Sequence, residues 1–134
     1  ADHFIIDGAH NPGAIEAFAE SVNTQRGNNF EKIILFSAVK EKEYETMIHM
    51  LCESVDAKQY ILTQIQNERG VSTKELADVF QKYTDKKIIE EENLEKAFYM
   101  ALEEKGEHGR VYCLGSLYLI GMLKELIAGG KKHA

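Results

Sequence analysis

The run from Asp7 to Pro12 reads Asp-Gly-Ala-His-Asn-Pro and lies between an apolar stretch and an amphipathic one. Its carboxylate, imidazole and amide can hydrogen-bond to sugar hydroxyls, phosphates or carboxylates. Gly8 lets the backbone turn sharply and leaves room for a ligand, and Asn11 before Pro12 is a good N-cap for a helix. The run therefore predicts a strand-to-helix turn that binds an anion or a nucleotide sugar.

The elements around this turn follow from the hydrophobic periodicity, which alternates five times between strand and helix spacing. Strands are predicted at about 3–7, 32–38, 58–64, 86–90 and 110–115, and helices at about 12–25, 43–55, 72–84, 93–105 and 116–128. This alternation predicts a Rossmann-like α/β fold with a mostly parallel sheet of about five strands and helices on both faces. Residues 1–128 are expected to form one domain, and residues 129–134 a disordered tail.

Several helix boundaries carry specific signals. Ser72 and Glu75 have the spacing of a capping box, and Asn93 is a predicted N-cap. Lys105 and Gly106 predict the end of the fourth helix. With these boundaries, the polar candidates at 7–11, 37–43, 63–72 and 115–116 all follow strands. Ligands of parallel sheets bind at the carboxyl ends of the strands, so one shared binding edge is expected.

The composition excludes several classes of function. The 134 residues carry a formal net charge of −6, which argues against nucleic acid as a partner. No apolar stretch approaches the roughly 20 residues that span a bilayer, and no signal peptide is found. Cys52 and Cys113 lack metal-ligand spacing and are expected to be buried free thiols in a reducing compartment, which predicts a cytoplasmic protein without a metal site of its own.

Three stretches, in order, resemble folylpolyglutamate synthases and dihydrofolate synthases, which belong to the Mur ligase superfamily of ATP-dependent amide ligases. The run from Asp7 to Pro12 resembles the opening of their C-terminal domain. Residues 36–43, Phe-Ser-Ala-Val-Lys-Glu-Lys-Glu, resemble the family's Gly-Ala-Leu-x-Asp-Lys-Asp loop, with Ser for Gly and Glu for both Asp. Residues 114–119 match Gly-Ser-Leu-Tyr-Leu, and residues 67–70 fall where the family often has an Arg-Ala pair.

The resemblance implies a reaction in which ATP phosphorylates a folate or pteroate carboxylate and L-glutamate then attacks the acyl phosphate. This chain would be the C-terminal domain of the ligase, working with an N-terminal P-loop ATPase domain of the same polypeptide. The sequence contains no P-loop motif of its own. We therefore expect ATP and Mg²⁺ to be used by the full-length enzyme, whereas this chain alone binds no cofactor and is inactive.

The resemblance also implies roles for individual residues. Asp7 would contact the ATP ribose, and His10 would be a catalytic residue that contacts phosphate. Asn11 and Arg69 would also bind the nucleotide, whereas Lys42 and Ser116 would bind the incoming glutamate.

Each residue has a purely structural alternative. Asp7 can form an Asx-turn, His10 can be a local hydrogen-bonding group, and Asn11 and Ser116 can be N-caps. Lys42 can be a solvent-exposed charge, as can Arg69.

A second class of function fits the same fold, namely a stand-alone α/β module that binds a nucleotide or an anion without catalysis. A dinucleotide-binding module would carry Gly-x-Gly-x-x-Gly after its first strand, but the glycines here, Gly8 and Gly13, have the wrong spacing. A P-loop upstream of this chain in the parent would favour the ligase. The sequence leaves open whether the parent makes dihydrofolate, extends polyglutamate tails, or does both.

Overall fold

Strands and helices alternate along the chain, as the hydrophobic spacing predicts. The structure is a computed structural model, and it describes residues 4–6, 9–24 and 30–132. The elements of this described part are β1 (Phe4–Ile6), α1 (Pro12–Thr24), β2 (Lys32–Phe36), α2 (Tyr44–Ser54), β3 (Gln59–Leu62), α3 (Thr73–Tyr83), β4 (Lys87–Glu90), α4 (Leu94–Glu104), β5 (Arg110–Leu114) and α5 (Leu117–Lys132). This order confirms the predicted α/β class.

The strands form one sheet in the order β1-β5-β2-β3-β4, and every pairing is parallel. The last strand, β5, lies between β1 and β2, so that Val111 pairs with Phe4 on one side and with Ile33 on the other. β2 and β5 are therefore interior strands. Their apolar sequences, Ile-Ile-Leu-Phe and Val-Tyr-Cys-Leu, are typical of strands that are covered on both faces.

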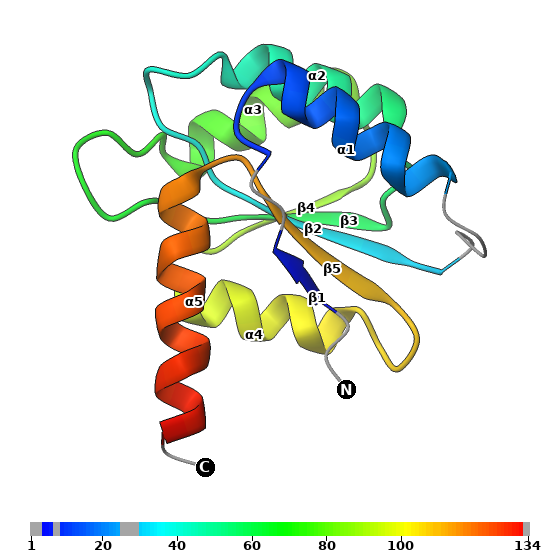
Figure 1. Cartoon of the computed structure of the whole chain (residues 1–134). Helices are drawn as coiled ribbons and strands as arrows, with labels where there is room; N and C mark the ends of the chain where they lie inside the picture. The colour runs from blue at the N-terminus through cyan, green and yellow to red at the C-terminus, as the bar shows by residue number, and fades with distance from the viewer. Residues whose placement is uncertain (1–3, 7–8, 25–29, 133–134) are drawn as a thin grey trace.

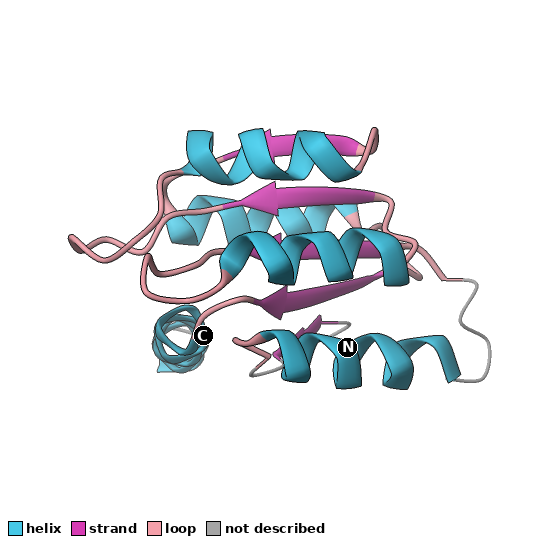
Figure 2. Cartoon of the chain, turned by 90° about the horizontal axis from the view of Figure 1, so that it is seen from above, coloured by secondary structure: helices cyan, strands magenta, loops and turns pink. Residues whose placement is uncertain are grey.

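Helices cover both faces of the sheet, as predicted (Figure 1; Figure 2). Alternate residues of β2 point to opposite faces, so Ile34 and Phe36 pack with α1, α2 and α3, whereas Ile33 and Leu35 pack with α4 and α5. In Figure 1 the first three helices lie above the sheet, α4 lies below it, and α5 runs downward from the left end of the sheet. The sheet is thus held between two apolar cores, which makes it a rigid support for the loops at its edges.

The helix boundaries follow the predicted signals. Asn11 Oδ1 accepts the backbone N–H of Ala14 at 2.8 Å and so caps α1. Ser72 Oγ and Asn93 Oδ1 accept the N–H three residues further on, at 3.1 and 2.9 Å. Gly106, just after α4, has a φ of +70°, the left-handed conformation that glycine adopts most easily. These local signals therefore determine where α1, α3 and α4 begin or end.

Two sets of boundaries differ from the prediction. β2 and β3 end at residues 36 and 62 instead of 38 and 64. Ser37 and Thr63 each donate one further N–H to the last residue of a neighbouring strand, and the Ala38 carbonyl oxygen then accepts from Val71 of the loop after β3. α5 continues through residues 129–132, so the prediction of a disordered tail from residue 129 was wrong for this stretch. Extending a formed helix fixes one residue for each new hydrogen bond, which costs less than nucleation. Residues 133 and 134 lie outside the described part.

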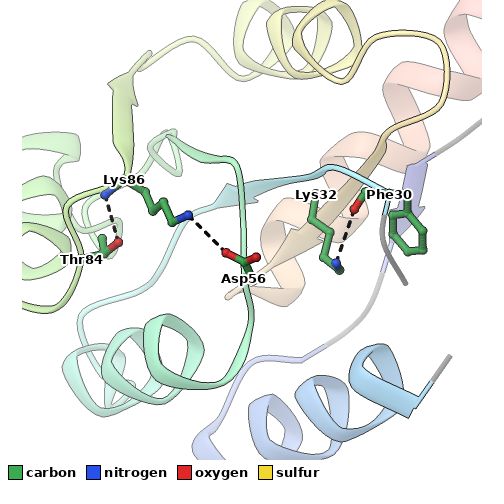
Figure 3. A network of polar contacts seen from close by, with 5 residues as sticks. All are labelled: Phe30, Lys32, Asp56, Thr84 and Lys86. Atoms are coloured by element: carbon green, nitrogen blue, oxygen red, sulfur yellow. Dashed lines mark hydrogen bonds and ion pairs between the residues drawn. The ribbon is translucent and has the colours of Figure 1, made fainter. Parts of the chain in front are cut away.

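The amino ends of the strands carry charged side chains that contact neighbouring protein groups (Figure 3). Lys86 Nζ lies 3.2 Å from Asp56 Oδ1, and the backbone N–H of Lys86 donates to Thr84 Oγ1 at 3.1 Å. Lys32 Nζ donates to the Phe30 carbonyl oxygen at 3.4 Å and lies 4.8 Å from the centre of the Phe30 ring. These contacts organise the segments that precede β2, β3 and β4.

Candidate functional site

Three strand-following loops meet at the carboxyl edge of the sheet. The backbone N–H of Gly115, directly after β5, donates to the Ala9 carbonyl oxygen at 2.8 Å. The N–H of Ser37, directly after β2, donates to the Leu114 carbonyl oxygen at 3.3 Å. These bonds hold the segment before α1, the loop after β2 and the start of α5 against one another.

This close approach depends on the absence of a side chain at Gly115. Its φ is +106°, a backbone conformation that other residues rarely adopt. A Cβ atom there would lie 2.0 Å from the Ser37 carbonyl oxygen and 2.9 Å from a ring carbon of Phe36. The glycine in the Gly-Ser-Leu-Tyr-Leu segment is therefore required by the packing of the loops.

A second set of backbone bonds holds the loop that carries Lys42. The N–H of Val71 donates to the Ala38 carbonyl oxygen at 2.9 Å, and the N–H of Lys40 donates to the Arg69 carbonyl oxygen at 2.8 Å. Between these bonds, residues 39 and 70 form an isolated antiparallel bridge. The loops after β2 and β3 are thus joined over three consecutive residues, which fixes the backbone next to Lys42.

A small cavity of about 100 Å³ lies where these loops meet the start of α5. It brings together three predicted site residues from separate parts of the chain, namely His10, Lys42 and Ser116. The other lining residues are Val39, Gly115, Leu117 and Tyr118. The sequence prediction of one shared edge is confirmed for these three side chains.

The cavity has the features of an anion site. Ser116 is buried, with 3% of its surface exposed, and its Oγ accepts the backbone N–H of Tyr118 at 3.1 Å at the N-terminus of α5. A helix N-terminus carries a partial positive charge, which attracts anions. Lys42 is exposed, and its ammonium forms no hydrogen bond or ion pair with the residues that the structure describes. The cavity therefore combines a lysine charge with a helix N-terminus.

Arg69 lies at the rim of this cavity and contacts protein groups on two sides. Its Nε lies 2.6 Å from Glu41 Oε1, and its Nη1 donates to the hydroxyl oxygen of Tyr118 at 2.6 Å. A hydrogen bond from its own backbone, together with Arg69, holds the pKa of Glu41 below its ordinary value. The neighbouring Glu41 carboxylate in turn raises the pKa of Arg69. Arg69 thus connects the Lys42 loop to the first turn of α5.

Asn11 and Arg69, the other predicted site residues that the structure describes, are not among the residues that line the cavity. Asn11 uses its side-chain oxygen to cap α1, which confirms the structural alternative without testing a contact to substrate. Asp7 lies outside the described residues, and its predicted ribose contact stays a prediction.

The sequence interpretation assigned no role to Tyr118 or Glu41, although both stand in segments that it singled out. Tyr118 belongs to the recognised Gly-Ser-Leu-Tyr-Leu segment, so a signal for it was present. Glu41 stands in a run of alternating charges, Lys-Glu-Lys-Glu, and such a run does not predict a contact with a distant arginine. Both were missed because their partner is Arg69, which lies about 30 to 50 residues away along the chain.

The two cysteines are free thiols, as predicted, and neither lines the cavity. Cys113 is buried as predicted, whereas Cys52 is only half-buried. Burial raises the pKa of Cys113 to about 12 and that of Cys52 to about 11. Both thiols are therefore protonated near neutral pH and are weak nucleophiles. Among the described residues, no group of His, Cys, Asp and Glu side chains could hold a metal ion, and no helix is long and apolar enough to span a bilayer.

Several solved structures of ligases share this fold. Escherichia coli FolC in complex with DHPP and ADP matches 98% of this chain with a TM-score of 0.85 and 17% identity. Mycobacterium tuberculosis folylpolyglutamate synthase with ADP and AMPPCP matches 92% with a TM-score of 0.78 and 20% identity. The bifunctional folylpolyglutamate synthase/dihydrofolate synthase of Yersinia pestis with AMPPNP and a Mn ion matches 96% with a TM-score of 0.76 and 17% identity.

This chain spans about 30% of the length of each of these proteins. Comparison with curated protein sequences found no match. The family described as Mur ligase, glutamate ligase domain, matches residues 2–117, which include the strand-helix turn, the lysine loop and the Ser116 segment. The chain therefore belongs to the Mur ligase glutamate ligase domain family.

Proposed function

We propose that this chain is the domain of an ATP-dependent amide ligase that binds the incoming L-glutamate and closes over ATP. The ligase is of the folylpolyglutamate synthase/dihydrofolate synthase type. The observation that carries the proposal is the cavity shared by His10, Lys42 and Ser116. The matched folylpolyglutamate synthases, which are described with ADP or ATP analogues, support the ligase class.

In this proposal, Lys42 pairs with a carboxylate of the incoming glutamate as a flexible point charge. Ser116 and the N-terminus of α5, which line the same cavity, contact the same substrate. The small volume of the cavity suits a single carboxylate group better than a whole nucleotide. Glutamate would therefore insert one carboxylate here and keep its amine outside, toward the acyl group.

The nucleotide would lie along the neighbouring segment before α1. Asp7 accepts hydrogen bonds from the ribose hydroxyls, His10 is a catalytic contact to phosphate, and Asn11 adds a contact at the helix start. Arg69 reaches the nucleotide from the rim. This arrangement places His10 between the two substrates, since it lines the glutamate cavity and precedes α1.

The complete reaction requires the rest of the polypeptide, with an N-terminal P-loop ATPase domain as the partner. ATP transfers its terminal phosphoryl group to a folate or pteroate carboxylate, which gives an acyl phosphate and ADP. The glutamate amine then attacks the acyl carbon, the bond to phosphate breaks, and an amide, inorganic phosphate and a proton are released. This domain contributes positioning and excludes water from the acyl phosphate when it closes.

The full-length enzyme would use Mg²⁺ with ATP, but the described residues of this chain do not form a metal site. No step proposed for this domain therefore depends on the metal. The two free thiols are compatible with a reducing compartment, and we place the enzyme in the cytoplasm.

The sharpest test replaces Lys42 in the full-length parent enzyme. Lys42→Ala removes a charge-assisted contact worth roughly 1.5 to 3 kcal/mol, so the glutamate KM should rise about ten- to a hundredfold while the ATP KM stays nearly constant. Lys40→Ala is the matched control, since Lys40 is an exposed lysine of the same loop that does not line the cavity. The control should leave both KM values unchanged.

If Lys42→Ala leaves the glutamate KM unchanged, Lys42 is a solvent-exposed charge and the assignment of the glutamate site fails. The isolated chain gives a further check, because it should release no ADP above background with ATP, glutamate and a reduced folate. Glutamate-dependent turnover by the chain alone would contradict the dependence on a partner domain.

A further inference from the structure

A groove of about 1040 Å³ lies between the start of α4 and the second half of α5, apart from the candidate site. None of the residues that line the His10 cavity also lines this groove. Figure 1 shows that α5 passes the beginning of α4 and continues beyond it. The second half of α5 therefore extends past the start of α4, and residues of both helices line the groove.

The rim of the groove is acidic. Four carboxylates line it, from Glu91, Glu92, Glu95 and Glu125, and no lysine, arginine or histidine is found among the described residues that do so. None of the four forms an ion pair with a described residue, in contrast to Glu31 and Asp56 at the amino edge. Four carboxylates that lack a cation in one groove attract a positively charged ligand.

The floor of the groove is apolar. Leu94 lies at its base with 9% of its surface exposed, and Met122 and Leu126 of α5 are half-buried. Tyr99 lies beside them with 52% of its surface exposed, an unusual exposure for a large aromatic residue. A methionine, two leucines and a tyrosine can enclose an aliphatic side chain, and flexible methionine adapts to different shapes.

We propose that this groove docks a basic polypeptide segment in which aliphatic side chains are flanked by lysines or arginines. The aliphatic groups pack on Met122, Leu126 and Tyr99, and the flanking cations pair with the glutamates of the rim. The volume suits several residues of a peptide. The acidic rim repels ATP, folate and glutamate, all of which are anions, so the groove is distinct from the proposed substrate sites. This inference does not depend on the proposed function.

The test uses the ¹⁵N-labelled chain and two synthetic peptides. One is acetyl-Lys-Lys-Leu-Lys-Lys-Leu-Lys-Lys-amide, and in the other serine replaces each leucine. The leucine peptide should shift the backbone amide resonances of residues 91–95 and 122–129 and leave those of α1 and α2 unchanged. The serine peptide should bind markedly more weakly, because it cannot use the apolar floor.

Matched variants separate a specific groove from general attraction to an acidic protein. Glu95→Gln combined with Glu125→Gln should weaken binding of the leucine peptide about tenfold. Glu16→Gln combined with Glu20→Gln makes the same charge change at exposed positions of α1 and should leave the affinity unchanged. All four positions are exposed, so both variants should keep the spectrum of the folded chain.

Three results would overturn the proposal. If the two double variants weaken peptide binding equally, only the net charge of the protein matters. If the two peptides bind equally well, the apolar floor does not contribute to binding. Shifts of the same amides with increasing protein concentration, without peptide, would identify a second copy of this chain as the occupant.

Discussion

The two edges of the sheet use charged side chains in opposite ways. At the amino edge, lysines are paired within the protein, as Lys58 is with Glu31 at 3.0 Å and Lys86 is with Asp56 at 3.2 Å. At the carboxyl edge, Lys42 lines a cavity and forms no such pair with the described residues. These lysines of the amino edge are thus neutralised within the protein, whereas the Lys42 cavity at the carboxyl edge retains a positive charge for a ligand.

The difference follows from the direction of the chain in a parallel α/β fold. Every strand leads into a helix at the carboxyl edge, so this edge receives the helix N-termini and their partial positive charge. The backbone alone therefore favours anionic ligands at this edge, without any contribution from side chains. The amino edge receives the helix C-termini, where lysines are electrostatically stabilised and contribute to structure rather than to binding.

The largest effect is expected from a backbone position at the carboxyl edge. Gly115→Ala should lower the free energy of unfolding by about 3 kcal/mol or more, because its left-handed φ and the contact with the Ser37 carbonyl oxygen leave no room for a Cβ. Gly121→Ala is the control, since a Cβ added at this position of α5 would meet no other part of the protein within 4 Å. That variant should be neutral or more stable by up to about 1 kcal/mol.

Thermal and denaturant unfolding of both variants measure this difference. Similar stability of Gly115→Ala and Gly121→Ala would contradict the claim that the loops of the carboxyl edge require a glycine at residue 115.

The next largest effect is expected for Asp7→Ala, which tests whether the carboxyl edge has separate nucleotide and glutamate regions. In the full-length enzyme, Asp7→Ala should raise the ATP KM about tenfold and spare the glutamate KM, the reverse of Lys42→Ala. A tenfold change corresponds to about 1.4 kcal/mol, close to the lower end of the roughly 1.5 to 3 kcal/mol that a hydrogen bond to a charged group contributes. Initial rates with each substrate varied in turn provide the measurement. A parallel response of the two variants would show that the edge is one undivided site.

A smaller effect is expected at the rim, where Arg69 contacts both Glu41 and Tyr118. Arg69→Ala should raise the ATP KM a few-fold, in keeping with its proposed nucleotide contact. Tyr118→Phe keeps the ring but removes the hydroxyl that accepts from Arg69, and should leave the ATP KM unchanged. If both variants raise the glutamate KM instead, Arg69 acts by holding the wall of the glutamate cavity.

The smallest effect is expected at the amino edge. Lys86→Ala breaks an exposed ion pair with Asp56, and such pairs contribute about 0 to 1 kcal/mol to stability. Neither KM of the full-length enzyme should change, because Lys86 does not line the cavity at the carboxyl edge. A change in either KM caused by Lys86→Ala would contradict the proposal that the substrates bind at the carboxyl edge and not at the amino edge.

The local sequence determined most of the fold. Periodicity placed the ten elements to within a few residues, and Asn11, Ser72 and Asn93 began their helices as predicted, because capping depends on groups within three residues. The predicted helix end at residue 128 was wrong, since α5 continues through Gly129 and Gly130 to Lys132. Glycine disfavours a helix by only about 1 kcal/mol per residue, too little to mark an end reliably.

The sequence predicted one shared edge, but only the tertiary structure decided which residues of that edge line the same cavity. His10, Lys42 and Ser116 come from three segments, and they meet because β5 returns to the middle of the sheet, between β1 and β2. Strand order depends on contacts between distant residues, which periodicity does not record. The same reason explains why the Arg69 contacts and the groove beside α5 were not foreseen. A sequence specifies what each segment can form, whereas packing of the complete chain determines which segments become neighbours.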